Sequence, residues 1–447
     1  MKLFCLTICS FFLIALDLFA QPSNVLPTKQ QVEWIQKEIG VIITLDINIY
    51  APETFDYAKK ETLPPVSAFH PSRLNTDQWV LAAKTAGAKY AVLTAKHGTG
   101  FALWYTKAND YHVGNSPVKL DVIRAFVKSC RKYGVRPGIY YNTNMNTLYG
   151  AGYTPLSGDK RLEFNAIVEK QLSELWSTYG ELFEIWFDGG VMSDSKTGIA
   201  DKVKDLIDKH QPNALLFGGP AGWKNVIRWV GNEDGGTPYP HWSRAGSQTA
   251  TDGVEEIHGT SGNPDGKYWM PGEADFPNRK KSAWNGGWLW KAGEERHLFN
   301  SDELLDRFYT SVGRNSNMLI GMAIDTAGLF PELDATIFKE FGNKLSQREK
   351  SKVGSTKGSG YTYTIDFKNP NEINQIEIQE DIAKGERIRA YQVEAFMDGK
   401  WTKLCEGISV GHKRIQLIDK VKTGTIRLTV TSASEQPVVK SFSAYMF

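Results

Sequence analysis

The stretch Glu184-Ile-Trp-Phe-Asp-Gly-Gly190 reads as a short buried strand that ends in a carboxylate and a glycine turn. Side chains alternate along a strand, so Glu184, Trp186 and Asp188 share one face. Parallel barrels keep their catalytic residues at the C-terminal ends of their strands. The competing interpretation is that Asp188 only opens a turn or caps the next helix, as many Asp-Gly pairs do. The stretch therefore predicts a barrel strand that delivers an acid and an aromatic ring to one cavity.

Short apolar runs alternate with longer amphipathic stretches on both sides of this strand, from Trp34 to about Phe341. Residues 90–97, 138–142, 183–188 and 214–218 have the pattern of strands, and residues 119–133 and 164–179 that of helices. This rhythm is typical of a parallel sheet with crossover helices. A closed, TIM-type (β/α)8-like barrel is the preferred interpretation, and an open doubly wound sheet is the alternative. No glycine-rich nucleotide fingerprint follows the first strand, which disfavours the alternative.

The pattern changes after the polar segment 347–352, which we interpret as a linker. Short alternating runs follow at 361–367, 373–378, 391–397, 414–418 and 425–430, and turn signals such as Asp398-Gly399 separate them. That pattern predicts a small β-sandwich. The predicted domains are a catalytic barrel at 21–346 and a sandwich at 347–447. A carbohydrate-binding module and a structural appendage both fit the sandwich, and the structural role is favoured.

The first twenty residues have the layout of a secretory signal peptide. Lys2 precedes an apolar run from Leu3 to Leu16, and the chain turns polar after Ala20. A membrane anchor is the competing interpretation, but the run is short for a stable span and Asp17 follows it. We expect residues 1–20 to be removed and the protein to be exported, to the periplasm, the cell surface or the medium.

Composition narrows the class of partner. The chain has 447 residues, of which 41% are hydrophobic and 23% charged, so a large core can be built. A formal charge of +2 without a basic block predicts no nucleic-acid partner. Aromatic residues make up 12% of the chain, and carbohydrate sites use such rings to stack on sugars. Most of these rings must still be core.

The predicted strand ends supply the candidate chemistry. If their side chains have matching phase, one cavity is lined by His97, Tyr140, Trp186 and Asp188. Glu233, which follows another strand-like run, is the candidate second carboxylate, and its neighbour Asp234 is an equal alternative. A retaining glycosidase needs two such groups, an ionised nucleophile and a protonated acid. Without this context, Glu233 would be a solvated loop acid and His97 a buried core histidine.

Three stretches of the barrel region resemble the retaining α-L-fucosidases: residues 69–104, residues 138–141 and the strand 184–190. The resemblance implies that Asp188 is the nucleophile and that His97, Tyr140 and Trp186 contact the sugar. The segment around Glu233 is similar to the acid/base region of the subgroup that cleaves α-1,3 and α-1,4 fucosyl branches, which implies the acid/base role for Glu233. The implied activity is exo-hydrolysis of terminal α-linked fucose from a fucosylated glycan or oligosaccharide, without metal or organic cofactor.

Two positions depart from the pattern of that family. Members usually carry a histidine early in the first strand, where this chain has Thr44, and a second histidine where it has Gly98. The loss of two imidazoles leaves the preferred sugar open between fucose and a relative of the same ring configuration. A retaining glycosidase for another sugar and a non-catalytic carbohydrate-binding protein are the rival functions, and the pairing of Asp188 with Glu233 disfavours the second.

Overall fold

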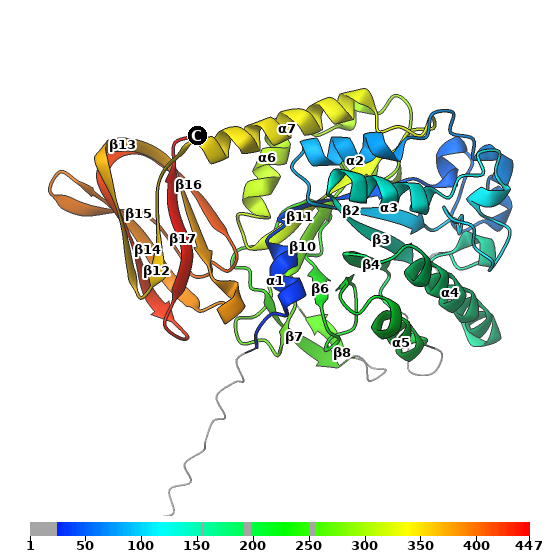
Figure 1. Ribbon diagram of the computed structural model, residues 1–447, viewed down its shortest axis with the longest axis horizontal. Helices are drawn as coiled ribbons and strands as arrows, with labels where there is room; N and C mark the ends of the chain where they lie inside the picture. The colour runs from blue at the N-terminus through cyan, green and yellow to red at the C-terminus, as the bar shows by residue number, and fades with distance from the viewer. Residues whose placement is uncertain (1–24, 153–155, 192–197, 250–254, 259) are drawn as a thin grey trace, which may run out of the picture.

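The computed structural model describes residues 25–447 apart from 153–155, 192–197, 250–254 and 259. The predicted signal peptide lies outside the described residues. Figure 1 shows two bodies side by side, with the barrel on the right and a β-domain on the left. The long helix α7 runs along the top of the barrel towards the second body.

The first body is a closed barrel of eight parallel strands, as the sequence predicts. Its strands, in the order in which they hydrogen-bond around the barrel, are β1 (Ile39–Thr44), β11 (Ser316–Ala323), β10 (Gly272–Phe276), β6 (Val226–Trp229), β5 (Leu215–Phe217), β4 (Glu184–Asp188), β3 (Arg136–Asn142) and β2 (Tyr90–Lys96). The pairing of β1 with both β2 and β11 closes the ring. The open doubly wound sheet is therefore wrong.

Helices cover the outside of most of the barrel. They are α2 (Thr76–Thr85), α3 (Val122–Tyr133), α4 (Gly158–Thr178), α5 (Ala200–His210), α6 (Ser301–Thr310) and α7 (Glu332–Lys350), while α1 (Lys29–Ile35) precedes the first strand. Asn75 and Asp121 cap the N-termini of α2 and α3 by accepting main-chain N–H groups, which satisfies donors that the first turn leaves free.

The barrel departs from regular β/α alternation after its fifth strand. The described segment 218–225 joins β5 to β6 without a helix. Beyond β6 the chain forms a three-stranded antiparallel sheet in the order β8 (Glu255–His258), β7 (Arg244–Thr249), β9 (Tyr268–Trp269) before it re-enters the barrel at β10. The loop between β6 and this sheet carries Glu233, so an irregular part of the fold presents the second carboxylate.

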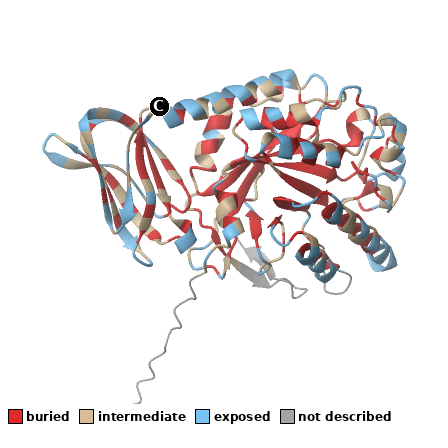
Figure 2. Ribbon diagram, viewed as in Figure 1, coloured by how far each residue is buried: buried red, intermediate tan, exposed pale blue. Residues whose placement is uncertain are grey.

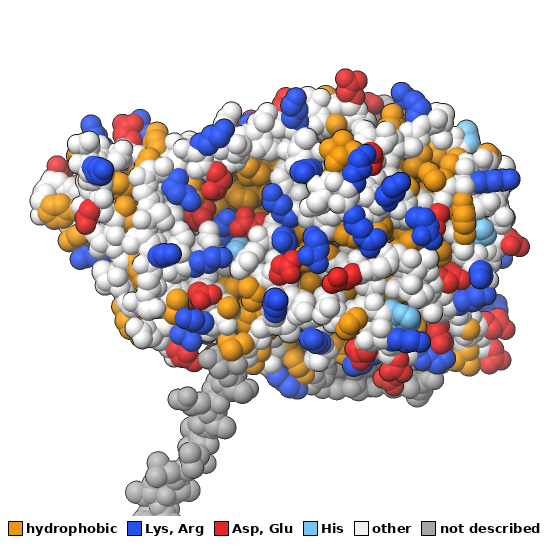
Figure 3. All heavy atoms as spheres, in the orientation of Figure 1, with side chains coloured by type: hydrophobic (Ala, Val, Ile, Leu, Met, Phe, Trp, Pro, Cys, Tyr) orange, Lys and Arg blue, Asp and Glu red, His pale blue; other side chains and the backbone are white. Residues whose placement is uncertain are grey.

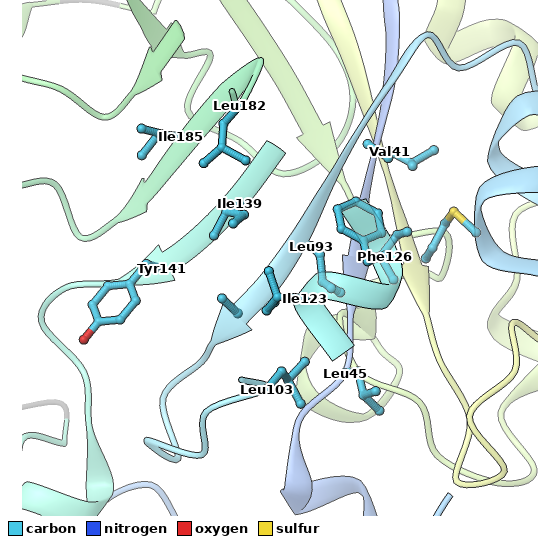
Figure 4. Packing of buried hydrophobic residues seen from close by; sticks show 14 of the residues in the cluster. Val41, Leu45, Leu93, Leu103, Ile123, Phe126, Ile139, Tyr141, Leu182 and Ile185 are labelled. Carbon is cyan, nitrogen blue, oxygen red and sulfur yellow. The ribbon is translucent and has the colours of Figure 1, made fainter. Parts of the chain in front are cut away.

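The barrel strands are largely buried (Figure 2). The barrel core has an outer layer, between strands and helices, and an inner one. Figure 4 shows the outer layer, where Val41, Leu93 and Ile139 on the strands pack with Ile123 and Phe126 of α3. An inner cluster fills the barrel with larger rings. Strand β4 follows the predicted alternation, because Ile185 and Phe187 belong to the outer layer and Trp186 to the inner cluster.

The second body is an antiparallel β-sandwich. Its strands, in hydrogen-bonded order, are β12 (Lys352–Ser359), β17 (Val438–Tyr445), β13 (Thr362–Glu380), β16 (Arg414–Ala433), β14 (Ile388–Met397) and β15 (Lys400–Gly407). Strands β13 and β16 are long and have register shifts near their middles, so each contributes to both layers. The predicted runs 361–367 and 373–378 are consequently one strand, as are 414–418 and 425–430.

The two bodies meet through buried polar contacts. The segment interpreted as a linker is helical as far as Lys350, and Arg348 in its last turn is fully buried. The Arg348 guanidinium binds the Glu377 carboxylate of β13 at 2.9 Å and lies over the Tyr445 ring at 4.2 Å. Glu38, just before β1, binds Lys413 of the sandwich at 2.6 Å. Since buried charges need such partners, the connection between the bodies is a packed interface.

The surface mixes charges of both signs. On the face shown in Figure 3, Lys and Arg side chains are interspersed with Asp and Glu. Within the described part of the chain, no helix is both long and apolar enough to span a bilayer.

Candidate active site

Asp188 ends strand β4 and points into the mouth of the barrel. The parallel register places Asn142 of β3 directly beside it. Its Oδ2 accepts hydrogen bonds from the Tyr140 hydroxyl and from Asn142 Nδ2, the second at 2.6 Å. Gly189 and Gly190 follow with φ of 78° and 74°, which a glycine adopts without strain. With both donors on Oδ2, the carboxylate is oriented and Oδ1 is left to act on a bound molecule.

Stacked rings form one wall next to Asp188. The Trp186 ring lies 5.2 Å from that of Tyr140 and 3.8 Å from that of Phe217, with interplanar angles of 23° and 7°. On the other side of Tyr140, the His97 ring stacks at 5.9 Å. These residues lie on, or directly after, the neighbouring strands β2 to β5, so the barrel register builds a stack of rings of which His97, Tyr140 and Trp186 border the cavity.

His97 is held in place by an acid and a phenol. Its Nδ1 lies 3.2 Å from the Tyr57 hydroxyl and 3.6 Å from Asp46 Oδ2. Asp46 is buried, and its Oδ1 accepts hydrogen bonds from Thr99 Oγ1 and from the main-chain N–H of Ile47. The contacts of Nδ1 fix the ring, so that Nε2 is the nitrogen available to a ligand.

Lys96, the residue before His97, supports the site from inside the protein. It is fully buried, and its ammonium donates to the carbonyl oxygens of Asn142 and Met145. Burial lowers the pKa of Lys96 to about 7, against the opposing attraction of Asp188 and Asp46. The ammonium therefore fixes the main chain that carries Asn142 beside Asp188.

Glu233 reaches the same cavity from the loop after β6. Its main chain has a φ of 51°, unusual for a residue other than glycine. The loop is tied on both sides of it, because Asn232 Nδ2 donates to the Gly236 carbonyl at 2.6 Å and Lys281 Nζ donates to the Asn232 carbonyl at 2.6 Å. Backbone strain of this kind persists where the surroundings enforce it, often at functional sites.

Asp234 does not share this position. Its side chain is 63% exposed and forms an ion pair with Lys281 at 2.9 Å. Of the two neighbouring acids, Glu233 borders the cavity and Asp234 faces solvent.

A cavity of about 90 Å³ lies at the barrel mouth. All five residues that the sequence singled out border it. The lining consists of Ile42, Thr44, Thr94, His97, Tyr140, Trp186, Asp188, Glu233, Asp275 and Trp288. Within the described residues, no cluster of three or more His, Cys, Asp or Glu side chains is arranged to hold a metal ion.

Sequence reasoning missed three residues of the site. Asn142 follows Tyr140 by two positions, so strand alternation alone could have placed it beside Asp188. Asp275 is the last but one residue of β10, in a segment whose chemistry the sequence left unassigned, and it is 3% exposed at the cavity wall. Trp288 comes from an irregular segment after β10, for which the sequence offers no periodic signal.

The two positions that depart from the family pattern are occupied by other contacts. Thr44 donates its hydroxyl to the carbonyl oxygen of Trp288. A Cβ at Gly98 would lie 2.6 Å from Met145 Sδ and 2.7 Å from a ring carbon of Tyr57. The space next to Gly98 is thus filled by side chains from other segments.

A pair of buried carboxyl groups lies beneath the aromatic wall. Glu273 accepts hydrogen bonds from the Trp186 indole at 3.1 Å and the Tyr90 hydroxyl at 2.6 Å, and Glu184 accepts from the Trp34 indole at 2.9 Å. Burial raises the pKa of Glu273 to about 7, and burial together with the charge of Glu273 raises the pKa of Glu184 well above its usual value. The pair retains a proton near neutral pH and anchors Trp186.

Two carboxyl groups that border one cavity beside stacked rings are the equipment for cleaving a glycosidic bond. The class of protein that this barrel and site define is the glycoside hydrolases.

Comparison with known proteins identifies the family. The sequence profile of the α-L-fucosidase family matches residues 18–350, and that of the F5/8 type C domain matches residues 343–442. The chain therefore belongs to the α-L-fucosidase family, which confirms the resemblance found in the sequence.

Individual relatives agree over nearly the whole chain. Alpha-L-fucosidase 1 of Arabidopsis thaliana is 28% identical over 94% of this chain and 87% of its own. The crystal structure of a putative α-L-fucosidase from Bacteroides thetaiotaomicron is 34% identical, covers 95% of this chain and 100% of its own, and superposes with a TM-score of 0.86. A glycoside hydrolase 29 family member from a rumen bacterium is 27% identical over 95% of this chain and 78% of its own, with a TM-score of 0.81.

Proposed function

We propose that Asp188 and Glu233 carry out the two-step hydrolysis of a terminal α-linked fucose. Asp188 Oδ1 attacks the anomeric carbon while Glu233 protonates the departing oxygen, and Glu233 then takes a proton from the water that releases the sugar. The observation that carries the proposal is the orientation of Asp188 by Tyr140 and Asn142 in a cavity that Glu233 also borders. His97, Tyr140 and Trp186 contact the sugar in the first subsite.

The nucleophile is tested with Asp188→Gly and an activated aryl fucoside. Turnover is expected to disappear without a change in thermal unfolding, and added azide is expected to restore part of it by entering the vacated space. Asp208→Ala, which removes an exposed carboxylate of α5, serves as the control and should keep the wild-type rate. Full activity in Asp188→Gly would refute the assignment.

The acid/base role is tested by changing the leaving group. Glu233→Ala should lose far less activity on an aryl fucoside with an activated leaving group than on a fucosylated oligosaccharide, because a good leaving group needs little protonation. Equal losses on both substrates would show that another group donates the proton.

The preferred linkage is proposed to be the α-1,3 or α-1,4 fucosyl branch. The similarity of the segment 230–235 to that subgroup supports this choice. A panel of α-1,2-, α-1,3-, α-1,4- and α-1,6-fucosylated oligosaccharides tests it, and faster release from α-1,2 or α-1,6 linkages would contradict it. Other aryl glycosides in the same panel test the rival retaining glycosidase.

We further propose that the enzyme is exported and that the signal peptide is cleaved near Gln21. The layout of Lys2, the apolar run and the polar segment after Ala20 supports this proposal. N-terminal sequencing of the protein from separated cell fractions tests it. A chain that retains Met1 in the cytoplasm would overturn it.

A further inference from the structure

Asp275 is a third carboxyl group in the catalytic cavity. Strand β10 lies next to β6, and Glu273 pairs in register with Trp229 at the end of that strand. Two residues further along, Asp275 points to the same side of β10 and borders the cavity together with Asp188 and Glu233. It is 3% exposed, so it faces the enclosed part of the site.

One oxygen of Asp275 is fixed by a neighbouring side chain. The Trp229 indole N–H donates to Asp275 Oδ1 at 2.6 Å. Trp229 itself is 46% exposed at the barrel rim and does not border the cavity. The indole therefore orients a carboxyl group that borders the cavity.

The electrostatic surroundings of Asp275 favour its uncharged form. The charged groups that act on it are Glu233, from the loop after β6, and Glu273, from its own strand, and both are acids. Asp188 and His97 share the same cavity. Burial, with smaller contributions from these two acids, raises the pKa of Asp275 to about 8, against the hydrogen bonds from Trp229 and from its own main chain. A protonated carboxyl group is a hydrogen-bond donor as well as an acceptor.

We propose that Asp275 is a substrate-binding residue that donates its O–H to one ring hydroxyl of the sugar and so selects for a sugar that carries it. The proposal rests on the fucosidase function proposed above. Burial of a carboxyl group in an apolar wall is an established way to keep a neutral acid as a donor at neutral pH. Leaving that donor unpaired penalises a sugar without the matching hydroxyl.

Two other roles for Asp275 give different results in the same experiments. As the true proton donor, it would act on the leaving oxygen, and its removal would affect poor leaving groups more than good ones. If Asp275 has only a structural role, its removal would change thermal unfolding and would weaken the binding of every sugar analogue to the same extent.

The decisive experiment combines removal of the Asp275 side chain with removal of each sugar hydroxyl in turn. Binding of L-fucose and of its 2-, 3- and 4-deoxy analogues is measured by titration calorimetry on Asp188→Ala and on Asp188→Ala/Asp275→Ala. L-Fucose is expected to bind roughly two- to tenfold more weakly to the double variant, the effect of one hydrogen bond to a neutral hydroxyl. For one deoxy analogue, the two proteins should bind equally. Equal affinity of both proteins for L-fucose, or the same loss for all four sugars, would overturn the proposal.

Turnover supplies an independent readout. Asp275→Asn keeps a donor of similar size and is expected to retain more kcat/KM on an aryl fucoside than Asp275→Ala does, and the control Asp208→Ala, at an exposed acid of α5, should match the wild type. A larger loss on oligosaccharides than on the aryl fucoside in Asp275→Ala would reassign Asp275 as proton donor and refute the binding role. If the wild type cleaves no fucoside, the proposed function fails, while the binding cycle still decides the role of Asp275.

Discussion

Replacing Tyr140 by phenylalanine removes one of the two hydrogen bonds that orient Asp188, and a neighbouring residue provides a matched control. Tyr140 and Tyr141 are consecutive on β3 and point to opposite faces of the strand. The Tyr140 hydroxyl donates to the Asp188 carboxylate, whereas the Tyr141 hydroxyl donates to Gln171 Oε1 at 2.6 Å in the helical layer. Both rings are buried. Tyr140→Phe removes a hydroxyl oxygen at the catalytic cavity, whereas Tyr141→Phe removes one in the helical layer.

The expected magnitude follows from the type of hydrogen bond. A bond to a charged group contributes about 1.5–3 kcal/mol, and about 1.36 kcal/mol corresponds to a tenfold change in rate. The Asp188 carboxylate needs its orientation when it attacks, and it regains its charge when it leaves the sugar in the second step. Tyr140→Phe should therefore lower kcat/KM roughly ten- to hundredfold. Tyr141→Phe removes a neutral hydrogen bond and should cost about 1 kcal/mol of unfolding free energy with little change in rate.

The assay is the initial rate on an aryl fucoside at a temperature well below the unfolding transition of both variants. Thermal unfolding of each variant separates stability from catalysis. A Tyr140→Phe enzyme within threefold of the wild type would show that Asn142 alone orients the nucleophile. An equal loss of kcat/KM in Tyr141→Phe would show that the effect is general loosening of β3.

Three further predictions concern stability and the closed corner of the cavity. Burial opposes ionisation of Glu38, but the charge of Lys413 and the contact with His412 hold its pKa well below the usual value near 4.5, so its contribution is present above that pH and lost below it. Glu38→Gln should thus lower the free energy of unfolding by about 1–3 kcal/mol at pH 7, and this difference from the wild type should shrink below pH 4.5. The control Glu33→Gln, in a more exposed ion pair, should show no such pH dependence. A difference for Glu38→Gln that does not change with pH would contradict the prediction. The pKa of Glu184 is raised instead, so its protonated form is favoured in the folded state and stability falls as pH rises above 4.5. The increase in melting temperature of Glu184→Gln over the wild type should therefore be larger at pH 8 than at pH 5. An equal increase at both pH values would count against this prediction. Gly98→His should lower the melting temperature because its side chain collides with Tyr57, and Tyr57→Ala in the same protein should partly reverse this loss of stability; unchanged stability in the single variant would show that the space beside Gly98 is open.

Much of the catalytic wall could be predicted because it depends on strand periodicity. Asp188, Trp186 and Tyr140 sit on regular strands, where a period of two and parallel register determine which side chains face the barrel. His97 extends the same logic by one residue past β2. The barrel closure itself was predicted from alternation of strands and helices, even though β5 and β6 lack a helix between them. In a regular strand, the local sequence is enough to show which side chains share a face.

The rest depends on contacts between segments distant in sequence. The direction of Glu233 is set by a loop whose ties include Lys281, 48 positions away along the chain. The segment at 347–352 has the composition of a linker, yet Arg348 is buried because acidic and aromatic partners await it in the sandwich. Composition does not reveal which partners a residue will contact, so the C-terminal end of helix α7 was interpreted as a linker.

The two missing histidines change the cavity in different ways, and together they bear on what the site recognises. Thr44 still borders the cavity, but its hydroxyl is donated to the Trp288 carbonyl. At Gly98 the space is filled by Tyr57, whose hydroxyl contacts His97. The hydroxyl of Thr44 is thus used within the protein. At Gly98, the space is taken by Tyr57, which holds His97 in place. Recognition of sugar hydroxyls then falls to fewer imidazoles, and the carboxyl group of Asp275 on β10, which borders the same cavity, is the additional donor proposed above.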